Sequence, residues 1–177
     1  MRAYYYSFNS DLLGEIYLAF TSKGLVRLSL HTEEKKDFFN WLKIYFDEIS
    51  EYNGEELEYS LQIKSYLKGK LKKFDIPVEF YGTEFQKKVW EQLLKIPYGS
   101  VRSYKDIALA IGKPKGFRAV GGANNKNPIP IIVPCHRVIN NNREIGGYGG
   151  GIDYKIKLLK LEGVKIEARK EKYIVEY

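Results

Sequence analysis

The sequence predicts an α+β protein with a small N-terminal antiparallel sheet and helices, followed by a mainly helical C-terminal domain. Short segments rich in aromatic and branched residues come first, at 3–8, 14–20 and 24–30. Segments with apolar residues at helical spacing dominate the second half. An extended, proline-containing stretch at 74–82 separates the two parts. We therefore expect two domains, at 1–78 and 79–177.

The N-terminal segments predict three strands and two helices. Ile16, Leu18 and Phe20 alternate along one stretch, so they share one face of a strand. Turn-like residues separate the three segments, which indicates an antiparallel sheet. Apolar residues then recur at helical spacing through 33–50. They are Phe38, Leu42, Tyr45, Phe46 and Ile49. We expect one helix there and a second at about 57–71.

Two capping patterns mark helix starts in the second half. Thr83 is followed three residues later by Gln86, which predicts a capping box. That helix should stop at the turn 97–100. Ser103 is the expected N-cap of a short helix that ends before Gly112.

A further short helix is expected within 117–127. Two short helices joined by a tight glycine-containing turn fit a helix-turn-helix. An ordinary helical hairpin would show the same spacing, so the pattern alone leaves both open.

The last part of the chain holds a glycine-rich loop and a final helix. The loop, 143–153, lacks the order of Gly, Lys and Ser/Thr of a phosphate-binding loop, so we expect close approach to a flat ligand instead. The helix, at 153–163, should turn its apolar side inward and place Glu162 at its end. The tail 168–177 allows no assignment.

Composition narrows the class of protein. The chain has 177 residues, 29 Lys plus Arg against 22 Asp plus Glu, and a formal net charge of +7. This excess favours polyanionic partners without naming one. A single cysteine forms no internal disulfide, and neither a signal peptide nor an 18-residue apolar run is seen. We expect a cytoplasmic protein without a membrane segment. One Cys and two His, with Cys135 and His136 adjacent, cannot supply a tetrahedral zinc site of Cys and His alone, so we expect no metal.

The single cysteine, Cys135, stands directly before His136 in an apolar run. A lone cysteine is most often an inert buried residue. A neighbouring base that lowers the pKa of the thiol would instead make it a nucleophile. Extended backbone would point the two side chains apart, so a turn or a bridging water must connect them. The acid that orients the base could be Glu144, Asp153 or Glu162.

Several separated motifs resemble one family in order and spacing. The region 83–164 is similar to the O6-alkylguanine-DNA alkyltransferases, while the first 80 residues match only in broad layout. The motifs are "PYGSVRSYKDIALAIG" (97–112), "FRAVGGANNKNP" (117–128), "PCHRV" (134–138) and "GGYGGGIDYKIKLLKLEG" (146–163). The resemblance implies a ribonuclease H-like layout and a supporting role for 1–78, and an alkyl-acceptor domain after it.

The resemblance also implies a reaction. An alkyl group would pass irreversibly from guanine O6 in duplex DNA to Cys135, once per protein, with the damaged nucleotide flipped out. His136 would act as base through a water, oriented by Glu162. Asn127 would brace the turn that carries the cysteine, and Tyr104 would protonate guanine N3. No cofactor is implied.

Roles in DNA and substrate binding follow from the same resemblance. Arg118 would fill the space of the extruded nucleotide, and the small residues of its helix suit the minor groove of double-stranded DNA. Further DNA contacts fall on Ala119, Gly121, Lys115 and Lys126, with Lys113 nearby. The substrate pocket falls on Pro130, Val138, Tyr148, Gly149 and the backbone of Cys135. We expect a monomer.

Two alternatives remain open: a non-catalytic module that binds damaged DNA, and a cysteine hydrolase that uses Cys135 and His136. Relatives that only bind lesions have tryptophan where this chain has Cys135. One departure from the family is Gly149, a position that is often serine. The change keeps a backbone N–H donor but removes a hydroxyl.

Overall fold

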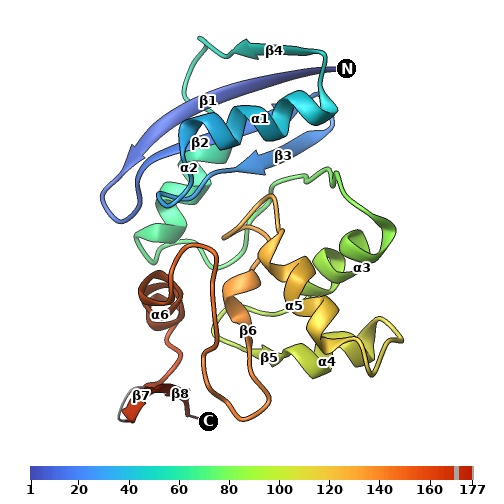
Figure 1. The fold of residues 1–177 in the computed structure, drawn as a ribbon. Coiled ribbons are helices and arrows are strands. Elements are labelled where there is room, and N and C mark those ends of the chain that lie inside the picture. The colour runs from blue at the N-terminus through green and yellow to red at the C-terminus, as the bar shows by residue number, and fades with distance from the viewer. Residues whose placement is uncertain (170–171, 177) are drawn as a thin grey trace. The chain divides into compact units, whose positions relative to one another are not determined.

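The computed structural model describes residues 1–169 and 172–176, and the chain divides into two compact units (Figure 1). The N-terminal unit comprises Met1–Tyr81 and Pro128–Ile132, and the C-terminal unit comprises Gly82–Asn127 and Val133–Tyr177. The predicted domains assigned 128–132 to the second part. The structure groups this segment with the first, where Leu28 N donates to Pro128 O at 2.9 Å.

A four-stranded sheet forms the centre of the N-terminal unit, with strand order β3-β2-β1-β4 (Figure 1). The three predicted strands pair antiparallel, with Tyr6 opposite Leu18. The fourth strand was not predicted and runs parallel to β1, with Ala3 opposite Ile49. The strands are β1 (Arg2–Ser10), β2 (Gly14–Thr21), β3 (Gly24–Leu28) and β4 (Glu48–Glu51).

The single helix predicted for 33–50 is wrong over its last five residues, 46–50. Helix α1 (Lys35–Tyr45) ends at Phe46, whose backbone is extended, and β4 follows. Phe46 and Ile49 still join the apolar cluster of α1, so their inward direction was read correctly. The pairing of β4 with β1 supplies backbone hydrogen bonds that a longer helix could not give to the sheet edge.

Helices cover both faces of this sheet. Alternate residues of β1 and β2, with Ala3 and Ala19 among them, pack against Phe38 and Leu42 of α1. The opposite face meets α2 (Glu58–Leu67), where the ring of Tyr59 packs against the ring of Phe20 in β2. Helix α2 ends four residues earlier than predicted.

Four helices shape the C-terminal unit, and both predicted caps form. The Thr83 side chain accepts from Gln86 N, and Ser103 makes a second capping box with Asp106. The Trp90 indole donates to a carbonyl of α5 at 2.9 Å, which ties α3 to α5. The helices are α3 (Glu84–Leu93), α4 (Tyr104–Ala110), α5 (Phe117–Asn125) and α6 (Ile152–Leu161). Helices α4 and α5 form the predicted helix-turn-helix, and the α+β class is confirmed.

Short elements connect these helices. They are β5 (Arg102–Ser103), the 3-10 turn η1 (Cys135–Arg137), β6 (Val138–Ile139), β7 (Ile166–Arg169) and β8 (Lys172–Val175). Strand β5 pairs in parallel with β6, and β7 pairs antiparallel with β8. The described part of the unassigned tail 168–177 therefore holds the end of β7 and all of β8, and Tyr173 O of β8 accepts from Ile145 N at 3.0 Å. No helix among the described residues is both long enough and apolar enough to cross a bilayer.

Candidate active site

The cysteine lies on a tight turn. Pro134 precedes η1, and Cys135 N donates to Val133 O at 2.8 Å. Arg137 N donates to Pro134 O at 2.9 Å, which closes the turn. Cys135, His136 and Arg137 are all buried, with the imidazole fully so. The turn replaces the extended backbone that would have pointed neighbouring side chains to opposite faces.

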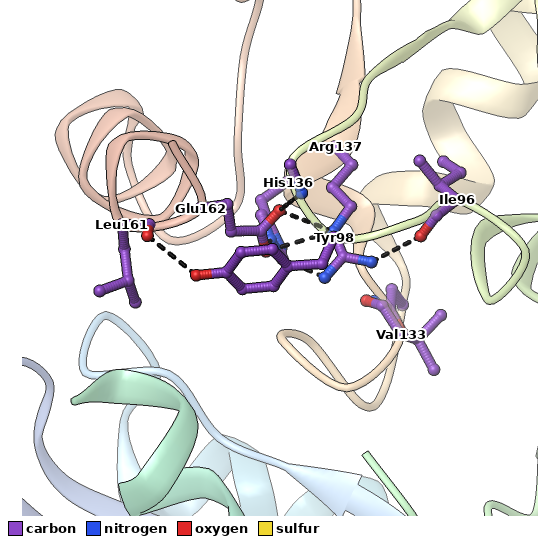
Figure 2. A network of polar contacts seen from close by, with 9 residues as sticks. Ile96, Tyr98, Val133, His136, Arg137, Leu161 and Glu162 are labelled. Carbon is purple, nitrogen blue, oxygen red and sulfur yellow. Dashed lines mark hydrogen bonds and ion pairs between the residues drawn. The ribbon is translucent and has the colours of Figure 1, made fainter. Parts of the chain in front are cut away.

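The imidazole, a carboxylate and a guanidinium form one buried network (Figure 2). His136 Nε2 lies 2.8 Å from Glu162 Oε1. Arg137 Nε donates to Glu162 Oε2 at 2.9 Å, and its Nη2 donates to Oε1 at 3.0 Å. Arg137 Nη1 donates to Ile96 O at 2.6 Å. Of the three acids that the sequence left open, the structure brings Glu162 to the imidazole.

The chain holds Glu162 from a second direction. The residue follows α6 directly and its Oε2 accepts from Gly99 N at 3.1 Å. Tyr98 donates its hydroxyl hydrogen to Leu161 O at 2.9 Å (Figure 2). Gly99 has φ +73, and a Cβ there would lie 2.9 Å from Glu162 O, so only glycine fits this approach. The turn at 97–100 thus positions the carboxylate.

The charges of the network depend on one another. Burial alone would raise the pKa of Glu162, but hydrogen bonds and charges from His136 and Arg137 outweigh it and lower the pKa to about 2. Burial lowers the pKa of His136, and Glu162 opposes this only in part. The result is an ionised carboxylate beside a neutral imidazole at neutral pH.

The thiol itself is not pre-ionised by its neighbour. Burial raises the pKa of Cys135, against the opposing effects of Asn127, Lys155 and Tyr148. The sequence predicted a lowered pKa from the adjacent ring, and for the resting protein that prediction is wrong. The reason is physical: the ring is neutral, and a buried sulfur loses the hydration that stabilises a thiolate.

Asparagine side chains brace the backbone around the thiol. Asn127 Nδ2 donates to Val133 O at 2.8 Å, as expected for a residue that supports the turn. Asn124 Nδ2 donates to Cys135 O at 3.3 Å. Asn124 lies in the last turn of α5 and Asn127 follows the helix, so the C-terminal end of α5 is bonded to the cysteine turn.

Strand pairing brings Tyr104 near the cysteine. Arg102 pairs with Val138 and Ser103 with Ile139, so the first residue of α4 falls beside the turn. Burial raises the pKa of Tyr104, and the negative charge that Cys135 would carry raises it further. The hydroxyl therefore stays protonated at neutral pH.

A buried lysine holds the loop that follows the turn. Lys155 of α6 is fully buried and donates to Val138 O and Ile145 O, both at 2.6 Å, and to Gly147 O at 3.3 Å. Burial lowers its pKa to about 8. These contacts fix both ends of the segment between the cysteine turn and the glycine-rich loop.

The other predicted residues are placed as follows. Four predicted DNA contacts are exposed on α5 and its flanks: Arg118, Ala119, Lys115 and Lys126. Gly121 is half-buried, and a Cβ there would lie 3.9 Å from Tyr104 Cε1. Of the predicted pocket residues, Val138 and Pro130 are buried, Tyr148 is half-buried and Gly149 is exposed. Pro130 belongs to the N-terminal unit, and its pocket role stays a prediction.

The change from serine to Gly149 has a local counterpart. A Cβ at this position would lie 3.2 Å from Asn125 Oδ1, tighter than ordinary contact. The side chain of Asn125 therefore takes up space that a serine would use.

Sequence reasoning missed Arg137, Lys155 and Asn124. Lys155 lies in α6 two turns before Glu162, which directly follows the helix, so the two residues lie on the same side, and this spacing was a usable signal for Lys155. A charged residue within the apolar run, as Arg137 is, was another. Among the described residues, no group of three or more Cys, His, Asp or Glu side chains is arranged to hold a metal.

A helix-turn-helix next to a buried cysteine with an imidazole and a carboxylate defines a class: DNA-binding proteins that carry a nucleophilic thiol. Two family models place the chain within that class. Residues 84–164 match the DNA binding domain of 6-O-methylguanine DNA methyltransferase, and residues 3–80 match its ribonuclease-like domain. The chain belongs to the 6-O-methylguanine DNA methyltransferase family.

Individual relatives agree with this assignment. The chain is 46% identical to the methylated-DNA–protein-cysteine methyltransferase of Methanosarcina barkeri over 158 residues, covering 89% of this chain and 96% of the relative. It is 45% identical to the inducible enzyme of that name from Bacillus subtilis, covering 82% and 83%. The structure of Mycobacterium tuberculosis OGT in complex with DNA superposes with a TM-score of 0.78 at 38% identity, covering 92% of each chain.

Proposed function

We propose that this protein repairs DNA by moving the methyl group of O6-methylguanine in duplex DNA onto Cys135. The observation that carries the proposal is the network behind the thiol. A cysteine on a tight turn adjoins an imidazole whose Nε2 lies 2.8 Å from the buried carboxylate of Glu162. This network lies within the segment that matches the family's DNA binding domain.

The thiol loses its proton to His136. Because Glu162 is ionised, it accepts a hydrogen from Nε2, which leaves Nδ1 as the basic nitrogen of the neutral ring. A water passes the thiol proton to Nδ1. Arg137 keeps Glu162 ionised and in place, so the imidazolium that forms meets a fixed negative charge. Lys155 supplies a second positive charge that favours the thiolate.

The displacement then needs a stable leaving group. Thiolate sulfur attacks the methyl carbon in line, the S–C bond forms, and the O6–C bond breaks. Guanine leaves with the electron pair of that bond. Tyr104, whose raised pKa keeps its hydrogen on oxygen, donates a proton to guanine N3. The products are S-methylcysteine and unmodified guanine.

The lesion must leave the duplex before it reaches the thiol. A base inside the stack cannot be reached, and extruding it costs a few kcal/mol. Arg118, exposed on α5, fills the vacated space from the minor groove. The exposed Lys115 and Lys126 neutralise phosphate charge without reading sequence. The backbone around Val138 and Gly149, with Tyr148 as a wall, receives the base.

The product thioether offers water no good electrophile, so one protein repairs one lesion. Such a reagent acts as a monomer on its DNA partner. It requires a reducing compartment such as the cytoplasm to keep its single thiol free. The N-terminal unit supports the fold in this proposal and supplies none of the groups that exchange protons or methyl.

The test is a stoichiometric titration. Duplex DNA with one O6-methylguanine is mixed with increasing protein, and the methylated base that remains is measured after acid hydrolysis. We expect loss of one lesion per protein and then no further reaction. Continued turnover, or no loss of the lesion, would refute the proposal.

Two variants separate the alternatives. Cys135→Ala should abolish demethylation yet keep lesion binding. If the wild-type protein binds the lesion but does not demethylate it, the protein is a damage-recognition module. Tyr104→Phe should slow transfer to duplex DNA and to free O6-benzylguanine alike, because it acts on the leaving group. Multiple turnover on an ester or peptide would instead indicate a cysteine hydrolase.

A further inference from the structure

The first residue of α5 is an exposed aromatic. Phe117 is 45% exposed although it is one of the larger apolar residues in the chain. It opens the second helix of the helix-turn-helix and directly precedes Arg118. A phenyl ring gains free energy when it leaves water, so its exposure at this position suits a surface that is covered during function.

The ring of Phe117 is paired with the arginine beside it. The guanidinium carbon of Arg118 lies 5.9 Å from the ring centroid, within reach of a cation–π contact. The two side chains therefore stand together at one end of α5. A single long flexible side chain would sample many directions, whereas a ring next to it restricts them.

One turn after Arg118, the helix surface carries a glycine. Gly122 is exposed, and a Cβ added there would meet nothing within 4 Å. Exposed Lys113 and Lys115 lie just before the helix and make its N-terminal end positive. An apolar ring and an arginine thus project from a small-residue surface with positive surroundings, which is complementary in charge and shape to a nucleic acid groove.

We propose that Phe117 is a second DNA-inserting residue, an apolar wedge that enters the minor groove of duplex DNA beside Arg118 where the damaged nucleotide is extruded. The inference rests on the proposed function and goes beyond it, because it assigns DNA opening to two side chains. Arg118 fills the vacated stack. Phe117 packs against the sugar and base edge of the neighbouring step and offsets part of the cost of unstacking.

This role makes a prediction that separates DNA opening from chemistry. Free O6-benzylguanine needs no extrusion, so its reaction with Cys135 does not involve Phe117. A lesion in single-stranded DNA is already largely unstacked, so it depends on the wedge only weakly. A lesion in a fully paired duplex depends on it most.

The experiment compares Phe117→Ala with a matched control, Leu109→Ala. Leu109 is 52% exposed near the end of α4, so it is an apolar surface residue of the same helix-turn-helix. Single-turnover rates are measured with the duplex lesion, the single-stranded lesion and free O6-benzylguanine. We expect Phe117→Ala to lower the duplex rate roughly tenfold, equal to about 1.4 kcal/mol, with smaller loss on the single strand. Its rate with the free base, and all rates of Leu109→Ala, should stay within about twofold of wild type.

Each result decides between explanations. Equal rates of Phe117→Ala and wild type on the duplex would overturn the wedge. An equal loss on all three substrates would also overturn it, since the effect would then lie in the pocket or the fold. A loss on both DNA forms without distinction would make Phe117 a general contact to DNA and reject the wedge. Phe117→Leu should recover part of the duplex rate. A wild type inactive on every substrate would refute the proposed function instead.

Discussion

Each unit of the molecule contains an arginine–glutamate pair that is largely shielded from water, and these two shielded pairs differ in surroundings. In the N-terminal unit, Arg27 and Glu33 form an ion pair with side chains 15% and 17% exposed, and the guanidinium lies 4.8 Å from the Trp41 ring centroid. In the C-terminal unit, Arg137 and Glu162 are 8% and 0% exposed and share their contacts with an imidazole. The pair of the N-terminal unit lies at the edge of an apolar core. The pair of the C-terminal unit is part of a buried polar network.

The contrast extends to the cores. Among the described residues, the buried Lys, Arg, His and Glu side chains all lie in the C-terminal unit: His136, Arg137, Lys155 and Glu162. The buried polar side chains of the N-terminal unit are serines, and its core is aromatic and aliphatic. Burying charge costs more than apolar packing would, so charges concentrated around one thiol indicate selection for chemistry.

Replacing the glutamate of each pair, Glu162 or Glu33, by glutamine should give the largest difference in stability and transfer rate between the units. Glu162→Gln leaves Arg137 buried without a charge partner and removes the group that orients His136. We expect a loss of about 3–5 kcal/mol in the free energy of unfolding. We also expect a roughly hundredfold slower reaction with free O6-benzylguanine. Chemical denaturation and single-turnover kinetics measure the two effects.

Glu33→Gln is the matched control. Its pair is only partly buried, so the cost should stay below about 1 kcal/mol, with no change in transfer rate. Similar rate losses in both variants would break the distinction between the units.

Phe38→Ala should lower the stability of the protein without changing its rate of methyl or benzyl transfer. The ring is fully buried between α1 and the sheet, so its removal should cost about 3–5 kcal/mol. Folded protein at low temperature should still react with free O6-benzylguanine at the wild-type rate. A defect in the rate of the folded fraction would show that the N-terminal unit takes part in chemistry.

Acid should destabilise the C-terminal unit in a manner that identifies its network. The folded pKa of Glu162 is about 2, below its ordinary value of 4.5, so its stabilisation is complete above pH 4.5 and is lost as the pH falls towards 2. The amount is about 3 kcal/mol. The pKa of His136 is also lowered, so the unfolded chain takes up its proton first and stability begins to fall below about 6.5.

Urea midpoints measured as a function of pH test this. Wild type should lose stability more steeply than Glu162→Gln between pH 4.5 and 2. Parallel curves would mean that the carboxylate has the same pKa in both states.

Arg118→Ala should change the activation free energy less than Glu162→Gln does, and its effect should be confined to duplex DNA. We expect roughly tenfold slower reaction in duplex DNA and no change with the free base. Arg118 is exposed, so its replacement should leave folding unchanged, because surface substitutions cost little. Equal losses on both substrates would remove its intercalating role.

Local sequence signals predicted the C-terminal unit well. The capping box at Thr83, the N-cap at Ser103, the short helices of the helix-turn-helix and the end of the last helix near Glu162 all formed. These features are encoded by side chains that bond to nearby backbone, so they can be read from neighbouring residues.

Features set by distant contacts were missed. Strand β4 was predicted as helix because Phe46 and Ile49 keep helical spacing, while its pairing with β1 is invisible in the sequence. The segment Pro128–Ile132 joins the N-terminal unit through contacts far along the chain. The role of Arg137, and the choice of Glu162 over Glu144 and Asp153, needed three-dimensional positions or a family resemblance.

The central claim is that the sulfur of Cys135, the only cysteine in the sequence, receives the methyl group. The direct measurement is intact-protein mass after incubation with duplex DNA that carries O6-methylguanine, followed by peptide mapping. The account predicts a gain of one methyl group, confined to the peptide with Cys135 and absent in Cys135→Ala. An unchanged mass, a second methyl group, or methylation at another residue would contradict it.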